Sequence, residues 1–292
     1  MQFAFERRTL QLWVVTVATL VAFAANSVLG RAALFPGGSG APSIDPISFT
    51  VVRLLAGATL LFLLILGNRW KKGEMEIRGS WLASSALMIY AAALSWSYLS
   101  LSAGTGALIL FGFVQATMYG WAVWSGERLR LGTWLGLAVA SLGLITLSAP
   151  GIEKPPLLGG VLMAVAGIAW GGYSLLGRGQ SQPVLATAGN FLRCGPLMLL
   201  LIPWVVTRGV YTNRGLLLAV ISGALTSGLG YVLWYTALKN LTATRAALVQ
   251  LSVPVLAALG GVLFLGEFFS LRLAIATLLV LGGIGLAIVQ KD

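Results

Sequence analysis

The sequence predicts an all-α integral membrane protein, with ten transmembrane helices that form two five-helix repeats of inverted topology around a central cavity. Composition is the first observation behind this fold class: 58% of the 292 residues are apolar, 9% are charged, and the mean hydropathy is +0.91. These values lie well outside the range of soluble domains. The second observation is the length of the apolar runs, and the third is a short phrase that occurs twice.

Apolar runs of about eighteen residues or more follow one another along nearly the whole chain, and each can cross a bilayer as a helix. Turn-forming segments such as FPGGSGAPSIDP, APGIEKPP and GRGQSQP separate them and leave no room for a soluble domain. The first run is longer than a signal-peptide core, so we expect it to be retained as a span. The expected spans are, in chain order, Leu10–Gly30, Ile47–Asn68, Trp81–Leu101, Thr105–Ser125, Leu131–Ala149, Leu157–Gly177, Val184–Thr207, Gly215–Leu238, Ala246–Gly266 and Leu273–Gln290.

The basic residues between the spans predict the orientation of the chain. Of the 19 lysines and arginines, two lie inside spans; with a cytoplasmic N-terminus, twelve of the others fall on the cytoplasmic side and five on the opposite side. We therefore expect a multi-pass protein of the inner (plasma) membrane, in contact with lipid and with both termini in the cytoplasm. Ten spans are enough to enclose one cavity, so a monomer is expected.

The composition also argues against several classes of function. The net charge of +11 does not indicate nucleic-acid binding, because the basic residues are dispersed in short links between apolar runs. Histidine is absent and Cys194 is the single cysteine, so no intramolecular disulfide, metal or cofactor is expected. The aspartates, Asp45 and Asp292, fall in a loop and at the C-terminus, where they cannot form the paired acids of a membrane enzyme. A channel or a receptor is disfavoured because the sequence lacks rings of charge and filter-like loops.

The repeated phrase is Gly-Glu: Gly126-Glu127 and Gly266-Glu267 lie 140 positions apart, each between two apolar runs. An equal shift aligns Arg53 with Arg193, Leu101 with Leu241, Ala103 with Ala243, Ala107-Leu108 with Ala247-Leu248, Leu131 with Leu271 and Gly143 with Gly283. A shift of 147 aligns SVLGR at 27–31 with SLLGR at 174–178. We infer a duplicated unit of five spans, residues 1–149 and 150–292. An odd number of spans inverts the second unit, which is a recurring plan of secondary transporters with a substrate site near the midplane.

The role of the repeated charged residues stays open between two interpretations. In the structural one, each glycine ends a helix, and Glu127 and Glu267 favour the N-terminus of the helix that follows. The alternative is that the glutamates bind protons or substrate. Arg53 and Arg193 also have two interpretations. In one, they pair with helix-end carbonyls or with a carboxylate; in the other, they contact substrate.

With ten spans, two five-helix units and a Gly-Glu that closes the fourth span of each, the chain resembles the drug/metabolite transporter superfamily and, within it, the EamA-type branch. The resemblance extends from ANSVLGRAAL in the first span to LGGIGLAIVQ in the last. The segments IYAAALSW, LFGFVQAT, AWGGYSLLGR and GLGYVLWYTAL make the chain similar to YddG-type exporters of aromatic amino acids. This resemblance implies a central cavity lined by aromatic side chains, carried over by position to Tyr90, Phe111, Phe113, Trp170, Tyr231 and Trp234.

The aromatic residues themselves support part of that assignment. Trp and Tyr near span ends commonly mark the membrane interfaces, which accounts for the tryptophans at such positions. Tyr90, Trp170 and Tyr231 fall near mid-span instead, where the O–H or N–H needs a partner that a wet cavity can provide. Plain packing between helices is the alternative interpretation.

Amide side chains at membrane depth are further polar candidates: Asn26, Gln115, Asn190 and Gln250. A polar group inside a span costs free energy unless it has a partner. Because the ammonium and carboxylate of an amino acid also need partners, Asn26, Gln115 and Gln250 are predicted to bind substrate, with interhelical hydrogen bonding as the alternative. Pro254 is expected to kink its span near Gln250 and to leave a carbonyl free.

The sequence therefore predicts a secondary transporter that exports amino acids, aromatic or other large zwitterionic or neutral ones, across the inner membrane by alternating access. The alternatives are export of another small metabolite or drug, and exchange of nucleotide sugars or sugar phosphates. Phosphates would require several basic residues facing the cavity, whereas Arg53 and Arg193 alone lie in spans. No Asp or Glu lies mid-span, which favours downhill export over a dedicated proton relay.

Overall fold

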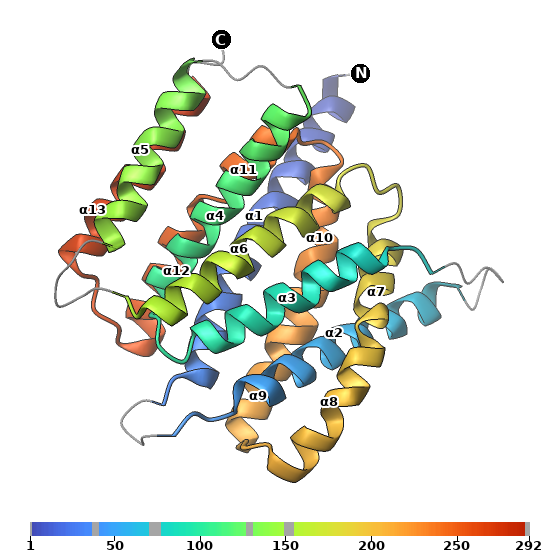
Figure 1. Ribbon diagram of the computed structural model, residues 1–292. Helices are drawn as coiled ribbons and strands as arrows, with labels where there is room; N and C mark the ends of the chain where they lie inside the picture. The colour runs from blue at the N-terminus through green and yellow to red at the C-terminus, as the bar shows by residue number, and fades with distance from the viewer. Residues whose placement is uncertain (1, 37–40, 70–76, 127–130, 149–154, 290–292) are drawn as a thin grey trace.

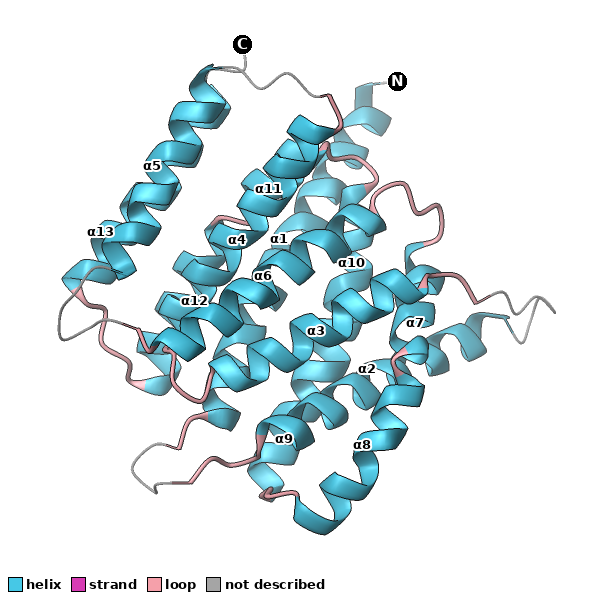
Figure 2. Ribbon diagram, in the orientation of Figure 1, coloured by secondary structure: helices cyan, strands magenta, loops and turns pink. Residues whose placement is uncertain are grey.

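The computed structural model describes residues 2–36, 41–69, 77–126, 131–148 and 155–289, and within these residues the chain is almost entirely helical (Figure 2). An isolated antiparallel bridge joins Ile44 to Tyr211. The segment Ser222–Leu229 is π-helical. The helices are α1 (Gln2–Leu34), α2 (Pro46–Arg69), α3 (Trp81–Ser97), α4 (Ala103–Trp124), α5 (Leu131–Ser148), α6 (Leu157–Gly177), α7 (Pro183–Arg193), α8 (Gly195–Arg208), α9 (Asn213–Ile221), η2 (Ser222–Leu229), α10 (Gly230–Leu238), α11 (Ala243–Val249), α12 (Ser252–Leu265) and α13 (Leu271–Val289).

Each span expected from the sequence is occupied by helix, either in one piece or in consecutive pieces. Six helical stretches among the described residues are long and apolar enough to cross a membrane, and the bent pair α7–α8 brings the number to seven. The apolar stretches in α3, α5 and α13 are shorter. An all-helical, multi-pass membrane fold is therefore confirmed for the described residues, whereas ten spans stay a prediction.

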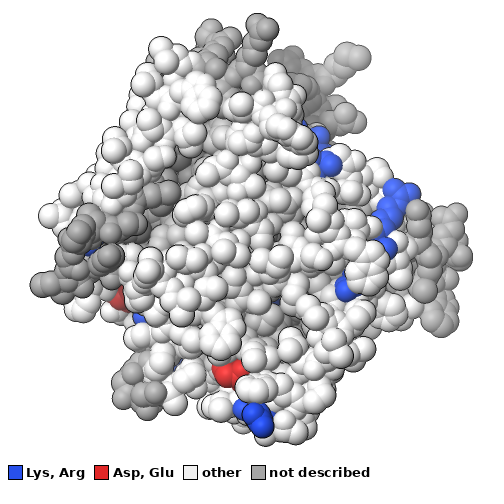
Figure 3. Space-filling model, viewed as in Figure 1, with Lys and Arg blue, Asp and Glu red and all other residues white. Residues whose placement is uncertain are grey.

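The surface has the composition that contact with lipid requires. On the face seen in Figure 3, charged side chains gather toward the margins, while the middle is almost free of them. Large apolar side chains of α3 and α6 are exposed, among them Leu82, Ile89, Val161 and Ile168. Because an exposed apolar belt of this kind is unfavourable in water, lipid is its expected neighbour.

The helices are arranged so that segments far apart in the sequence meet at the centre of the bundle. α6 packs against both α3 and α4, while α1 packs against η2, α10 and α12. The first turns of α1 and the last turns of α13 lie at the same end of the bundle (Figure 1). This arrangement agrees with the predicted placement of both termini on one side of the membrane.

α5 and α13 form a closely packed pair at one side of the bundle (Figure 1). A Cβ on Gly143 of α5 would meet residues 276, 279 and 280 of α13, and a Cβ on Gly283 of α13 would meet residues 136, 139 and 140 of α5. The two sets of contacts differ by the same 140 positions that relate the repeated sequences. The two helices are antiparallel, and their contact is reciprocal, as in an isologous interface.

Two of the helical stretches in the second half of the chain are interrupted. α7 and α8 meet at Cys194 with a bend of 46°, next to Pro196, which cannot donate a backbone hydrogen bond. α11 and α12 are separated by a turn at Gln250 and Leu251, close to where the sequence predicts a kink before Pro254. The carbonyl of Gln250 is not free, however, because it accepts a hydrogen bond from the backbone N of Val253 at 3.1 Å.

Candidate functional site

An aromatic cluster occupies the centre of the bundle, where α1, α3, α4, α6 and α10 converge. Trp170 contacts three of the other rings, with ring centroids 4.6 Å from Tyr231, 4.9 Å from Tyr90 and 5.1 Å from Phe23. In this conformation the rings pack directly on one another and are closed to solvent. The members of the aromatic cluster are Phe23, Tyr90, Phe111, Trp170, Tyr231 and Trp234, none of them more than 5% exposed.

The structure brings together all but one of the aromatic residues predicted from the sequence. The exception is Phe113, which is 36% exposed on the outer surface of α4. Two residues along an α-helix rotate the side chain by about 200°, so Phe111 and Phe113 cannot both face the centre. Packed rings also stand where the sequence predicts an open cavity.

Phe23 is the member of the cluster that is not among the predicted residues. Its ring centroid lies 5.7 Å from that of Trp234 and 6.0 Å from that of Tyr231. A signal is present in the sequence, because Phe23 precedes Asn26 by three residues and residues with this spacing share a helix face. Phenylalanine carries no polar side-chain atom, so the argument that polar groups inside spans need partners does not apply to Phe23.

Asn26 of α1 connects α3 and η2 through its side chain. Its Nδ2 donates to Tyr90 Oη at 3.1 Å, and its Oδ1 accepts from Ser222 Oγ at 2.6 Å and from Thr226 Oγ1 at 3.1 Å. Ser222 and Thr226 belong to η2, and π-helical turns of this kind occur frequently at functional sites. Asn26 therefore lies beside the aromatic cluster with hydrogen bonds to the protein on both of its polar atoms.

Gln115 and Gln250 both bind carbonyl groups near the interruption between α11 and α12. Gln250 Oε1 accepts from Trp170 Nε1 at 2.9 Å, and Gln250 Nε2 donates to the carbonyl of Ala246 at 3.1 Å. Gln115 Nε2 donates to the carbonyl of Ala247 at 2.6 Å. Gln115 Oε1 is buried and has no hydrogen-bond partner among the described residues. These bonds match the interhelical interpretation, and they leave one acceptor unused a helical turn from Phe111.

Arg53 of α2 is 1% exposed and reaches the aromatic cluster with its guanidinium. Its Nη2 donates to Tyr231 Oη at 2.8 Å and to Tyr90 Oη at 3.3 Å, and its Nε donates to Ser227 Oγ at 3.0 Å. The remaining nitrogen, Nη1, is buried without a hydrogen-bond partner in the described part of the chain. Neutral hydroxyl groups therefore surround this cation.

Arg193, which aligns with Arg53 in the sequence repeat, lies in a different environment at the end of α7. Its Nη1 donates to the carbonyl of Arg78 at 2.8 Å and to the carbonyl of Gly189 at 3.1 Å. This is the pairing with backbone carbonyls that one of the two interpretations of the sequence describes. The two aligned arginines thus differ in what they bind.

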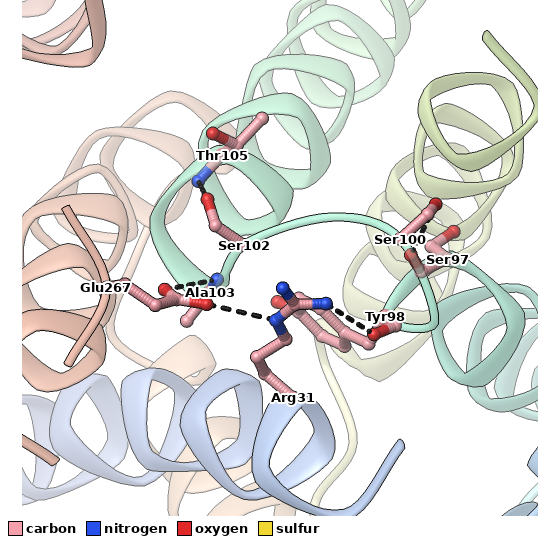
Figure 4. Close-up of polar contacts among 8 residues, drawn as sticks. All are labelled: Arg31, Ser97, Tyr98, Ser100, Ser102, Ala103, Thr105 and Glu267. Atoms are coloured by element: carbon pink, nitrogen blue, oxygen red, sulfur yellow. Dashed lines mark hydrogen bonds and ion pairs between the residues drawn. The ribbon is translucent and has the colours of Figure 1, made fainter. Parts of the chain in front are cut away.

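The second Gly-Glu joins three helices at the end of the bundle opposite the termini (Figure 4). Gly266 follows α12 with a φ of 63°, in the left-handed region that favours glycine. Glu267 Oε1 accepts from Arg31 Nε at 3.0 Å, and Glu267 Oε2 accepts from the backbone N of Ala103 at 2.9 Å. The carboxylate therefore caps the N-terminus of α4, whereas the sequence predicts that it favours the helix that follows, α13. Glu127 lies outside the described residues.

Arg31 extends this contact to a fourth helix and to a pocket. Its Nη1 donates to the carbonyl of Tyr98 at the end of α3 at 3.1 Å, and its guanidinium lies over the ring of Phe35. A polar pocket of about 520 Å³ beside the ion pair is lined by Arg31, Glu267, Ser43 and Arg214, among others. The ion pair thus fixes the ends of α1, α3, α4 and α12 relative to one another.

Comparisons with known proteins agree with this architecture. The model of the EamA-like transporter family matches residues 157–289, which lie within the second predicted unit. An uncharacterized protein of Pseudomonas aeruginosa is 48% identical, over 98% of this chain and 96% of its own length. The uncharacterized transporter YoaV of Bacillus subtilis is 25% identical, over 84% of this chain and 88% of its own length. A solved crystal structure with 20% identity has a TM-score of 0.65 and covers 94% of this chain and 98% of that chain, which shows a shared fold.

Proposed function

We propose that the chain is a transporter of the EamA-like family, whose model matches residues 157–289, and that it exports amino acids with large apolar side chains across the inner membrane by alternating access. The aromatic cluster is the observation that carries this proposal, because it places buried rings beside hydrogen-bonding groups in the middle of the bundle. Aromatic walls suit a large apolar side chain. Unused polar atoms, such as Gln115 Oε1, suit the charged groups of an amino acid.

Alternating access requires two halves that move relative to each other around one site. We take residues 1–149 and 150–292 as these halves, each an EamA-like unit of five spans, with both termini in the cytoplasm and one monomer as the working unit. The reciprocal contact between α5 and α13 supports this division, because it follows the same 140-residue shift as the sequence. The aromatic cluster also supports it, since both halves contribute three of its members.

The ion pair between Arg31 and Glu267 provides the proposed closure at the outer end. It holds α1 and α4 of the first half against the end of α12 in the second. Breaking it, together with the hydrogen bond to Ala103, would release these helix ends and allow the rings of the cluster to separate toward the outside. The 520 Å³ pocket beside the ion pair would then form the outer part of the path.

Downhill export is the proposed driving mode. Of the carboxylates whose side chains are described, Glu267 is engaged in the outer closure and Asp45 caps α2, with Oδ1 3.0 Å from the backbone N atoms of Ile47 and Ser48. Neither lies in the aromatic cluster, where a proton-carrying acid would be expected in a proton-coupled carrier. The gradient of the substrate itself would therefore drive transport.

Uptake into proteoliposomes tests the proposal, with labelled phenylalanine, methionine, threonine, lysine and glutamate beside a nucleotide sugar. We expect flux of phenylalanine and methionine that Trp170→Ala abolishes and Phe113→Ala leaves intact, since Phe113 lies on the same bundle but outside the cluster. Flux of the nucleotide sugar alone, or equal loss in both variants, would contradict it. Accumulation driven by an imposed proton gradient, and lost in Glu267→Gln, would contradict downhill transport.

A further inference from the structure

Arg53 carries a charge that the described protein does not neutralise. Arginine stays protonated in proteins, and a buried ion is costly unless it is paired. Within the described residues the ion pair that forms joins Arg31 and Glu267, far from Arg53 in the bundle, and Asp45 is used as a helix cap. The partners of Arg53 among the described residues are uncharged hydroxyls, so a bound anion can supply its counter-charge.

The geometry around Arg53 provides one donor without a partner among the described residues, Nη1, and two tyrosine hydroxyl groups beside it. Nη1 has no partner, and Tyr90 and Tyr231 each accept a hydrogen bond from Nη2, which leaves the O–H of each tyrosine as a donor. Asn26 Nδ2 also donates to Tyr90 Oη, so that oxygen already accepts two hydrogen bonds. Because Nε and Nη2 are already hydrogen-bonded, Nη1 and the neighbouring hydroxyl groups are the donors that can bind the two oxygens of a carboxylate.

From this arrangement we propose that Arg53, with the hydroxyls of Tyr90 and Tyr231, binds the carboxylate of the transported molecule, an assignment that rests on the proposed transport function. The apolar part of the substrate then lies among the rings of Trp170, Phe23 and Trp234. The substrate class is a small carboxylate with a large apolar side chain. The carboxylate is the group that is required, and the ammonium contributes less, because the described residues place no carboxylate beside it.

Such a site would also link the two halves through the substrate. Arg53 and Tyr90 come from the first half, whereas Ser227 and Tyr231 come from the second. A bound carboxylate that contacts both sides neutralises the cation and draws the halves together. Substrate binding would therefore couple the residues of the first half to those of the second once the rings have separated to admit it.

A ligand series on the unmodified protein gives the first test. Binding is measured by calorimetry on purified protein in chloride-free methanesulfonate buffer, with phenylalanine, phenylalaninamide and 3-phenylpropionate as probes. We expect phenylalanine and 3-phenylpropionate to bind, and the amide to bind roughly tenfold more weakly or worse, because it lacks the anionic group. Equal affinity for phenylalanine and its amide would overturn the assignment while leaving amino-acid transport in place.

Variants give the second test, with the aligned arginine as a matched control. Arg53→Gln is expected to remove the preference for the acid over the amide, and Arg53→Lys to retain part of it because the charge persists without the planar fork. Arg193→Gln, which loses contacts to backbone carbonyls only, should keep the preference. Because the comparison of ligands uses the unmodified protein, failure of an Arg53 variant to fold leaves the first test decisive.

The remaining outcomes separate this inference from the transport proposal. Binding and flux of 3-phenylpropionate without phenylalanine would support the carboxylate site and contradict an amino-acid substrate. Absence of binding by all three probes would contradict both. Binding of chloride that competes with every probe, without preference for the acid over the amide, would assign the guanidinium to an inorganic counter-ion and overturn the proposal.

Discussion

The two halves of the chain build their central helices in different ways. α2, α3 and α4 of the first half are continuous α-helices, whereas the corresponding stretches of the second half are bent at Cys194, π-helical in η2 and interrupted at Gln250. Pro196 and Pro254 align, at a shift of 140, with Ala56 and Val114 of the first half. Segments that the 140-residue shift aligns therefore differ in backbone conformation.

This difference shows how a membrane protein can hold polar groups at depth. The irregular backbone of the second half presents hydroxyls from η2 and carbonyls at the interruption of α11 and α12. The regular helices of the first half supply the long side chains that bind them, Asn26, Arg53 and Gln115. Irregular backbone is tolerated in a membrane only where such partners satisfy it. The difference in backbone between the halves is thus what brings polar groups together beside the aromatic cluster.

The largest effect is expected where η2 crosses α2. A Cβ on Gly223 would overlap the backbone carbonyl of Arg53, while the first half has Ala83 at the aligned position. Gly223→Ala should lower the free energy of unfolding by about 3 kcal/mol or more, because backbone cannot move aside as a flexible side chain can. Thermal denaturation in detergent measures this. Gly172→Ala, in α6 with no atom within 4 Å of the added Cβ, should be neutral or stabilising. Equal effects of the two substitutions would contradict the close crossing.

The next effect in size separates the two faces of the continuous helix α4. Phe111→Ala removes a buried ring from the cluster and should cost about 3 kcal/mol, whereas Phe113→Ala on the exposed face should cost less than about 1 kcal/mol. Denaturation of both variants under the same conditions measures the difference. If Phe113→Ala destabilised the protein as much as Phe111→Ala, the orientation of α4 would be wrong.

A smaller effect is expected at the ion pair that ties the halves together. Arg31 and Glu267 are partly buried, so a double-mutant cycle with Arg31→Gln and Glu267→Gln should give a coupling of about 1 kcal/mol. Because Glu127 aligns with Glu267 in the sequence repeat, Glu127→Gln is predicted to lower the free energy of unfolding about as much as Glu267→Gln does. A coupling near zero would mean that the pair does not hold α1 against α12, and a silent Glu127→Gln would show that the two Gly-Glu phrases have diverged in role.

The smallest change in stability is expected from a substitution that makes the interrupted helix α11–α12 continuous. The same substitution should change transport clearly. Pro254→Ala restores the missing N–H and favours a continuous α11–α12, like the α4 of the first half. The free energy of unfolding should change by less than about 1 kcal/mol. Transport should fall several-fold, because the turn at Gln250 holds the partner of Trp170 Nε1. Unchanged flux in proteoliposomes would show that the interruption is not needed.

Much of the fold follows from the apolar runs and the repeat, while the site follows only in part. Tyr90, Trp170 and Tyr231 meet at the centre because mid-span aromatics with polar atoms need buried partners. Phe113 does not join them, because Phe111 and Phe113, two positions apart in α4, point to opposite faces of that helix. The capping of α4 by Glu267 could not be foreseen, because a link to a helix 164 residues away depends on tertiary packing. The different partners of Arg53 and Arg193 also depend on which helices surround each of them.

The reciprocal packing of α5 and α13 also has a consequence for biosynthesis. α13 begins 140 residues after α5, which at about 5 to 20 residues per second separates their emergence from the ribosome by about 7 to 28 seconds. During that interval the glycine face of α5 is in the membrane without the helix that finally covers it. The first half is therefore completed only when the last helix has been translated. A chain that ends before α13 would leave that face of α5 in contact with lipid in place of its helix partner.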